Sequence, residues 1–179
     1  MNRALVTAAL LVASTSVASA GTYLGLGVGP GANFNGDERI EDGGRSARLL
    51  GGYSFGRFSA EASITGQTLF LNDNGGVTFD TRELALNAKF NLPLGSGFEV
   101  FGKAGLHHTW ISADASDVYS VDGNGLLVGA GFEYRVKTPV AAGSLWVDYT
   151  HYAGDLTGDV YAYRGAGVGM WMLGVSVGI

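Results

Sequence analysis

The chain has 179 residues, of which 46% are hydrophobic and 15% charged, with a formal net charge of −5 and no cysteine. The lack of cysteine excludes a disulfide scaffold and a thiolate metal site, and an acidic chain without a basic cluster is not expected to bind nucleic acid. Thirty glycines but only three prolines, without a triplet repeat, exclude collagen and argue against a disordered linker.

Residues 1–20 are predicted to be a secretory signal peptide. Arg3 supplies the positive charge, residues 4–13 form an apolar core, and Ala18-Ser19-Ala20 resembles a cleavage site. The alternative, a buried N-terminal helix, does not explain the small residues at its end. Residues 21–179 then form one domain. No later stretch reaches about 18 apolar residues, so any membrane insertion must use strands.

The mature chain alternates apolar and polar residues with a period of two, which predicts strands. We expect eight of them, at 22–29, 46–55, 58–69, 81–92, 98–110, 125–136, 144–152 and 165–179. Tilted strands of roughly 9–11 residues with one apolar face are typical of barrels that cross a membrane. The predicted fold is therefore all-β, an eight-stranded antiparallel up-and-down transmembrane β-barrel.

The polar face of these strands carries a balanced set of charges. By parity it holds four basic and four acidic residues: Arg48, Lys89, Lys103 and Arg135, with Glu61, Glu83, Glu133 and Asp148. A soluble barrel would instead place charges outside and apolar residues inside. Because isolated charges in an enclosed lumen are costly while paired ones are tolerated, we predict that these eight form a structural network in the lumen. Glu99 has the same parity but is expected to be a solvated charge at the rim.

The connections between the strands alternate in length. Long polar loops are predicted at 30–45, 70–80, 111–124 and 153–164, and short turns at 56–57, 93–97 and 137–143. Outer membrane barrels place long loops outside the cell and short turns in the periplasm, so both termini are expected in the periplasm. Aromatic residues at the two ends of the strands would form girdles at the membrane interfaces. The periplasmic set is Tyr53, Phe55, Phe58, Phe90, Phe98, Phe132 and Tyr134, and the outer set is Trp110, Tyr149 and Trp171.

Four stretches, in this order, carry a resemblance to a known family: RLLGGYSFGRFSAEAS, FEVFGKAGLHHTW, VGAGFEYRV and the final LGVSVGI. Together they resemble the OmpA-like transmembrane domain, the family of eight-stranded outer membrane β-barrels. The resemblance implies folding by the barrel assembly machinery. It also implies an assembly signal at Gly174, Val177 and Ile179, with isoleucine where the family usually ends in phenylalanine.

Two glycine motifs match the patterns of functional sites. The segment from Gly52 to Gly56 fits the G-x-S-x-G elbow of serine hydrolases with Ser54 as nucleophile, but the elbow needs a following helix and the residues from Phe58 alternate like a strand. Residues 27–32 fit a dinucleotide fingerprint, yet no helical periodicity follows them. Both are predicted to be ordinary turns or strand ends.

Histidines and loop carboxylates are the other candidate site residues. His107 and His108 are adjacent in a strand, so they point to opposite faces and cannot chelate one ion. PagL-type lipid A deacylases, also outer membrane barrels, have a His-x-Ser pair near His151, but here Tyr152-Ala153 follow and the nucleophile is missing. The loop carboxylates lack the spacing of a calcium loop; they are Asp73, Asp114, Asp117, Asp122, Asp155 and Asp159. We therefore predict no catalytic residue, no cofactor and no metal site.

The leading functional hypothesis is a structural or surface-interaction protein of the cell outer membrane, whose lumen is filled by its own side chains. The expected partners are outer membrane lipid and lipopolysaccharide, with no nucleic acid. Two alternatives stay open. One is a narrow pore for small solutes or ions, since several inward residues are glycines; the other is a lipid-modifying enzyme.

Overall fold

The computed structural model describes residues 21–31, 33–34, 40–71, 77–113, 120–137, 142–158 and 162–178. The predicted signal peptide, 1–20, lies outside them. The described residues form nine strands: β1 Gly21–Pro30, β2 Asn33–Phe34, β3 Ile40–Phe55, β4 Phe58–Leu71, β5 Val77–Gly95, β6 Phe98–Ala113, β7 Ser120–Lys137, β8 Ala142–Gly158 and β9 Ala162–Gly178. No helix among them is long and apolar enough to cross a membrane.

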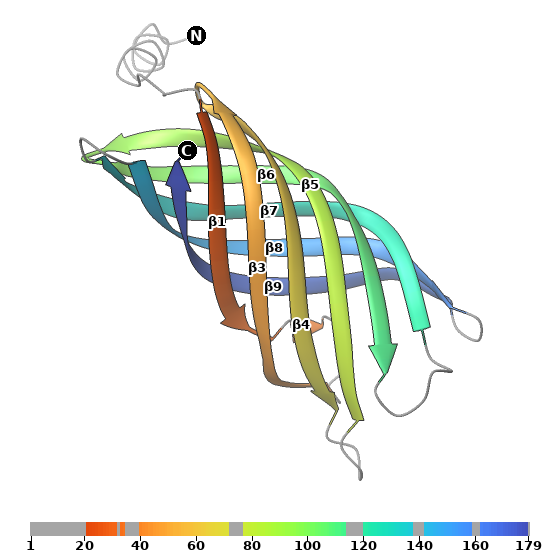
Figure 1. The fold of residues 1–179 in the computed structure, drawn as a ribbon. Helices are drawn as coiled ribbons and strands as arrows, with labels where there is room; N and C mark the ends of the chain where they lie inside the picture. The colour runs from red at the N-terminus through yellow and green to blue at the C-terminus, as the bar shows by residue number, and fades with distance from the viewer. Residues whose placement is uncertain are drawn as a thin grey trace, which may run out of the picture.

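The strands close into a barrel (Figure 1). Apart from the two-residue β2, each strand pairs antiparallel with the next along the chain, and β1 pairs with β9 to complete the ring. The short β2 pairs with β9 beyond the end of β1, where Asn33 lies opposite Gly169. Because β1 and β2 occupy one position in the ring, the nine segments make eight barrel strands. The predicted fold is confirmed.

The strands are longer than the sequence pattern predicts. Four predicted long loops, 30–45, 70–80, 111–124 and 153–164, are partly strand, since β3 begins at Ile40, β5 at Val77, β7 at Ser120 and β8 runs to Gly158. Most residues of the extensions 120–124 and 153–158 are polar or glycine, so these two lack a sustained apolar alternation, although Val77 and Phe79 do alternate with polar residues at the start of β5. Their backbone groups nevertheless continue the pairing of neighbouring strands, as Asp122 does with Thr157, which satisfies hydrogen bonds without any apolar signal.

The short turns lie at the same end of the barrel as the start of β1 and the end of β9 (Figure 1). Between β3 and β4, Phe55 pairs with Phe58 and only Gly56 and Arg57 form the turn. Gly56 has a φ of 76°, in the left-handed region, and Arg57 does not. This is the pattern of a type II′ hairpin, which places glycine first because its twist matches that of the strands. The predicted short turn at 56–57 is therefore present.

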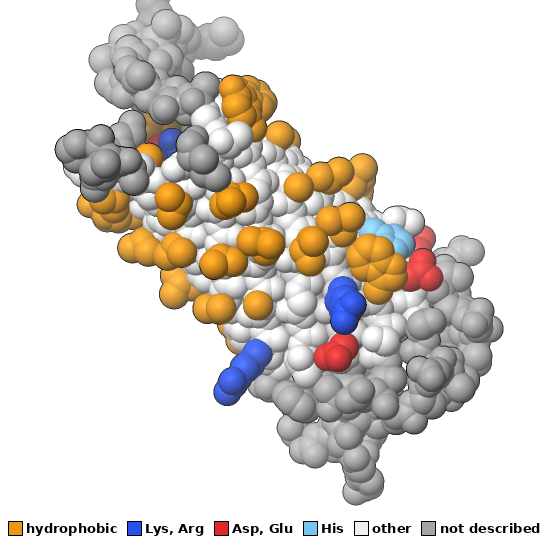
Figure 2. All heavy atoms as spheres, viewed as in Figure 1, with side chains coloured by type: hydrophobic (Ala, Val, Ile, Leu, Met, Phe, Trp, Pro, Cys, Tyr) orange, Lys and Arg blue, Asp and Glu red, His pale blue; other side chains and the backbone are white. Residues whose placement is uncertain are grey.

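The outer wall of the barrel is apolar (Figure 2). The outward side chains are those with the parity predicted for the apolar face. Many of them are highly exposed, among them Leu26, Leu49, Ile64, Leu86, Leu106, Leu126, Phe132 and Leu173. Such a wide exposed apolar surface is not compatible with water, but it is the surface that a barrel presents to hydrocarbon. The side-chain directions therefore fit a membrane barrel.

Aromatic side chains gather beside the short turns. Phe58 and Phe90 lie 5.0 Å apart between ring centroids, and Phe98 and Tyr134 lie 4.6 Å apart. Toward the long-loop end, Tyr149 and Trp171 lie 5.1 Å apart on neighbouring strands. These contacts place residues of both predicted girdles on the outer wall, where aromatic rings at the membrane interfaces are favoured.

Candidate functional site

The centre of the lumen holds a cluster that joins three strands that are not neighbours. Asp148 on β8 accepts hydrogen bonds from Arg48 on β3: Arg48 Nη1 lies 2.9 Å from Asp148 Oδ2 and 3.2 Å from Asp148 Oδ1. Asp148 also forms an ion pair with Lys103 on β6. The other N–H groups of Arg48 also donate hydrogen bonds: Nη2 to the Tyr152 hydroxyl at 2.9 Å and Nε to Thr65 Oγ1 at 3.3 Å. All of these side chains are buried. We call Arg48, Lys103 and Asp148 the central cluster.

A second group lies nearer the short turns. Lys89 Nζ lies 2.7 Å from Glu133 Oε2 and 3.5 Å from Glu61 Oε1, and it sits over the Phe101 ring at 4.2 Å. Glu61 also accepts from the Tyr23 hydroxyl at 2.6 Å and from Asn87 Nδ2 at 3.0 Å.

These contacts satisfy both carboxylate oxygens of Glu61, as buried charges require. We call Lys89, Glu61 and Glu133 the turn-end cluster.

Arg135 and Glu99 extend the turn-end cluster toward the rim. Arg135 donates to Glu133 Oε1 at 3.3 Å and lies 3.0 Å from Glu99 Oε2, which also accepts from Asn91 Nδ2 at 2.7 Å. The side chain of Glu99 is only 13% exposed. It was expected to be a solvated rim charge and is instead a partner of Arg135, because the cross-strand register brings β6 and β7 side chains together there.

Glu83 is the one predicted network residue without an ion pair to a described residue. It is buried and lines a small hollow of about 30 Å³ toward the long-loop end of the lumen. Four buried atoms in this lining have no hydrogen-bond partner among the described residues: Gln67 Oε1, Thr81 Oγ1, Glu83 Oε1 and His107 Nε2. A polar hollow of this size suits ordered water. We call it the polar hollow.

Apolar side chains fill the remaining lumen. Leu50, Phe101, Leu127, Trp146, Met170 and Met172 form one buried cluster with Ala85 and Tyr152. The position of Trp146 is fixed by two kinds of contact. Its indole N–H donates a hydrogen bond to Ser176 Oγ at 2.9 Å, and its ring lies over Gly27 and Gly174. A Cβ at either glycine would overlap the ring. Glycines on β1 and β9 therefore both leave space for the Trp146 side chain of β8.

Sequence reasoning placed the eight charges on the inner face but missed several neutral partners. Tyr23, Tyr152, Asn87 and Asn91 supply hydrogen bonds to the ions, and Trp146 fills the space beside them. A usable signal exists in the sequence: Phe101 and Trp146 are large apolar residues that fall on the polar face of their strands. A filled lumen accounts for this exception to the alternation.

The other candidate motifs do not assemble into a site in the described residues. Ser54 is buried near the end of β3 and is followed by strand β4, so the helix that an elbow needs is not there. His107 packs on the Tyr152 ring inside, and His108 contacts Asn124 Oδ1 at 2.8 Å outside. The described residues contain no group of three or more metal-ligating side chains that could hold an ion. Asp73, Asp114, Asp117 and Asp159 lie outside the described part of the chain.

The two described residues of the predicted assembly signal, Gly174 and Val177, lie in different environments. Gly174 lies under the Trp146 ring, and Val177 is exposed on the outer wall. Ile179 lies outside the described residues. Gly174 therefore has a packing requirement that is independent of any recognition by assembly machinery.

Comparison with solved structures shows outer membrane barrels. Neisserial surface protein A is 18% identical with a TM-score of 0.64, covering 92% of this chain and all of that one. The N-terminal barrel domain of Pseudomonas aeruginosa OprF is 15% identical with a TM-score of 0.56, covering 90% and 100%. Yersinia pestis Ail, in complex with the heparin analogue sucrose octasulfate, is 15% identical with a TM-score of 0.58, covering 90% and 99%.

Identities this low show a common fold and nothing finer. None of the curated proteins compared is similar enough in sequence to count as a match. The family described as outer membrane protein beta-barrel domain, in contrast, matches residues 4–177. Together with the closed antiparallel ring, the apolar outer wall and the inward ions, this match shows that the chain belongs to the outer membrane protein β-barrel domain family.

Proposed function

We propose that this protein is a structural and surface-interaction barrel of the Gram-negative outer membrane, with a lumen closed to ions by its own side chains. The observation that carries the proposal is the central cluster. Arg48, Lys103 and Asp148 reach across the lumen from three non-adjacent strands and are buried. An eight-stranded barrel has just enough interior for side chains, and here charged and apolar side chains occupy it together.

The proposed orientation follows from the connections. The described two-residue turns after β3 and β5 lie at the same end of the barrel as the start of β1 and the end of β9. Outer membrane barrels place short turns in the periplasm. The long-loop end then faces the environment and would carry the surface interactions. No catalytic role is proposed, because alanine occupies position 153, where a His-x-Ser pair beginning at His151 would have its serine.

The second candidate, a narrow pore, is favoured by the polar hollow. Its four unpartnered polar atoms lie on the long-loop side of the central cluster, so solvent could reach the cluster from that side. Conduction would then require the paired charged side chains of the central and turn-end clusters to move apart. The two candidates differ in one measurable property, ionic conductance.

Planar-bilayer recording of the purified barrel tests the proposal. We expect no reproducible current steps from the wild-type protein, because the central and turn-end clusters fill the lumen. Combined replacement Arg48→Ala, Lys103→Ala and Asp148→Ala is expected to produce small steps, since it removes all three long side chains without leaving an unpaired charge among them.

The matched control is Arg57→Gln, which changes a charge at the short turn and leaves the lumen intact. Each variant is first checked for heat-modifiable migration on a gel, which shows that the barrel has folded. Regular steps from wild-type protein would overturn the closed lumen in favour of the pore.

A further inference from the structure

The polar hollow at the long-loop end of the lumen is lined by three oxygen atoms that have no hydrogen-bond partner among the described residues. They are Gln67 Oε1, Thr81 Oγ1 and Glu83 Oε1. The three residues are no more than 7% exposed, and a buried polar atom without a partner is costly. The hollow is therefore a candidate site for a ligand that binds oxygen.

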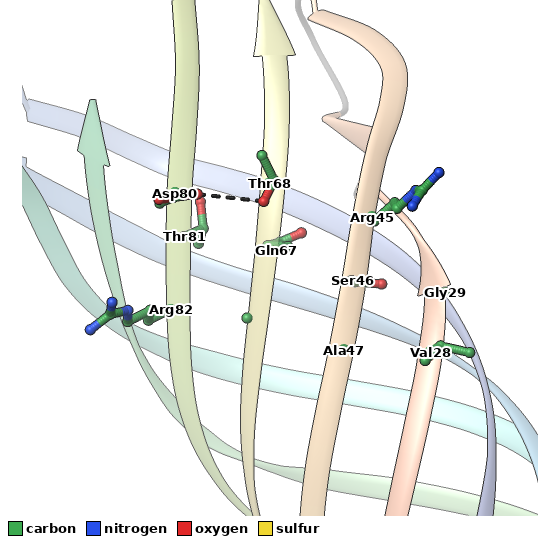
Figure 3. Close-up of a pocket in the computed structure, with 11 residues that line it drawn as sticks. Val28, Gly29, Arg45, Ser46, Ala47, Gln67, Thr68, Asp80, Thr81 and Arg82 are labelled. Carbon is green, nitrogen blue, oxygen red and sulfur yellow. Dashed lines mark hydrogen bonds between the residues drawn. The ribbon is translucent and has the colours of Figure 1, made fainter. Parts of the chain in front are cut away.

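The register of the strands brings the three residues together on the inner wall. Thr81 on β5 is the Cα partner of Gln67 on β4, and Figure 3 shows the two residues on these neighbouring strands. Glu83 lies two residues further along β5, so it points to the same face as Thr81. A carboxylate, an amide and a hydroxyl thus line one small space.

The surroundings of the hollow carry an excess of negative charge. Its lining contains the carboxylates of Glu83 and Asp155 and no lysine or arginine. The neighbouring central cluster adds two basic side chains and one acidic one. Taken together, the hollow and the central cluster have two basic and three acidic side chains, so one monovalent cation would balance their charge.

Glu83 also connects the hollow to the central cluster. The Tyr152 hydroxyl donates a hydrogen bond to the Glu83 carboxylate and accepts one from Arg48 Nη2 at 2.9 Å. The Oε1 atom of Glu83 stays without a partner among the described residues. A ligand on this atom would therefore be linked to the ions that hold the middle of the barrel together.

The size of the hollow and its atoms favour a small cation over water alone. A volume of about 30 Å³ holds about one or two ligands of water size. One water molecule can donate to only about two of the three oxygens, and it does not balance a carboxylate charge. A metal cation can bind all three oxygens at once, as carbonyl oxygens replace the hydration shell of ions in channels.

The ligand set favours a monovalent ion. Dedicated calcium sites use several carboxylates, and the described residues contain no group of three His, Asp or Glu side chains that could hold a metal. Alkali cations are bound by neutral carbonyl oxygens as well. The ring nitrogen of His107, also in the lining, suits transition metals and is not assigned as a ligand.

We propose that Gln67, Thr81 and Glu83 bind one monovalent metal cation, Na⁺ or K⁺, in the polar hollow. We call these three residues the cation site. The site departs from the sequence-based prediction of no metal site, because its ligands come from two strands and share no motif. It goes beyond the proposed function, since a lumen closed by side chains requires no bound ion.

Urea unfolding of the full mature barrel in phosphatidylcholine vesicles tests the cation site, because a ligand that binds only the folded state raises the unfolding midpoint. The midpoint is compared in sodium, potassium and choline chloride at one ionic strength, which keeps screening constant. Choline is too large for a hollow of about 30 Å³. We expect a higher midpoint in sodium or potassium than in choline.

Two substitutions of similar shape each remove one ligand. Glu83→Gln should abolish the difference between the salts, and Thr81→Val should weaken ion affinity about tenfold, measured from the dependence of the midpoint on salt concentration. In choline, Thr81→Val should unfold no earlier than the wild type, since it loses a buried hydroxyl without a partner. Sodium magnetic resonance relaxation reports the bound ion without unfolding, so Thr81→Val carries the test even if Glu83→Gln does not fold.

The matched control is Asp80→Asn, which removes a carboxylate from the outer face of β5. Asp80 accepts a hydrogen bond from the Thr68 hydroxyl at 3.4 Å there (Figure 3). This variant should keep the full difference between the salts.

Four results would overturn the cation site. Equal wild-type midpoints in all three salts would leave water as the only ligand. A salt difference that survives both Glu83→Gln and Thr81→Val, or one that Asp80→Asn also abolishes, would place the ion elsewhere. A larger gain in calcium chloride at the same ionic strength would indicate a divalent ion. Conductance plays no part in these outcomes, so a conducting barrel would overturn the closed lumen without affecting the cation site.

Discussion

Replacement of Asp148 by asparagine is expected to lower the free energy of unfolding by roughly 3–5 kcal/mol. Asp148 is the shared counter-ion of Arg48 and Lys103 in the central cluster. Without it, two buried cations remain near each other with no carboxylate between them, and a buried unpaired charge costs far more than the pair contributes. Urea unfolding in lipid vesicles, followed by tryptophan fluorescence, should show a lower midpoint with an unchanged slope.

A second variant tests whether the loss comes from the charges. Adding Lys103→Met to Asp148→Asn removes one of the stranded cations, so part of the lost stability should return, and the double-mutant cycle should show coupling between the two positions. If Asp148→Asn unfolds at the wild-type midpoint, the central cluster does not hold the barrel together. Independent, additive effects of the two substitutions would contradict the pairing with Lys103.

The other large effect is expected for Gly174→Ala. The new Cβ would overlap both the Trp146 ring and the main-chain carbonyl of Leu26. The ring has little room to retreat, because its N–H is bonded to Ser176 and Gly27 lies against its other edge. Overpacking typically costs about 1–3 kcal/mol, and contact with backbone places this case at the upper end. The folded, heat-modifiable band on a gel should weaken strongly.

Two further variants test the cause of the expected loss of folded protein. Gly102→Ala is the matched control, since a Cβ there has only the Gly129 carbonyl within 4.0 Å, and it should fold like the wild type. Trp146→Phe in the Gly174→Ala background removes the overlapping ring atoms and should restore part of the folded band. Failure of this rescue would contradict the indole as the main cause of the loss and leave the overlap with the Leu26 carbonyl to explain it.

Alternation and charge parity were enough to predict the barrel and the inward direction of the ions. Each strand has one row for hydrocarbon and one for the lumen, so a residue's parity fixes its side. This is why Arg48, Glu61 and Asp148 could be placed inside without coordinates. The family resemblance, now supported by the match over residues 4–177, led to the same fold independently.

Parity does not determine which ions meet. Partners across the lumen depend on the stagger of the strands around the ring, which a single sequence does not reveal. The sequence therefore does not assign Asp148 to Arg48 and Lys103. It also does not show that Glu99, expected to be solvated, pairs with Arg135. The strand extensions were missed for another reason: outside the membrane, backbone pairing continues in residues that no longer need to alternate.

The separation of the ion partners along the chain constrains how the barrel can enter a membrane. Arg48 and Asp148 are 100 residues apart, so a hairpin made of β3 and β4 would carry its arginine into the bilayer before its counter-ion had arrived. Stepwise insertion of single hairpins into hydrocarbon is thus disfavoured by electrostatics. The chain must keep these side chains hydrated until nearly all of the strands have come together.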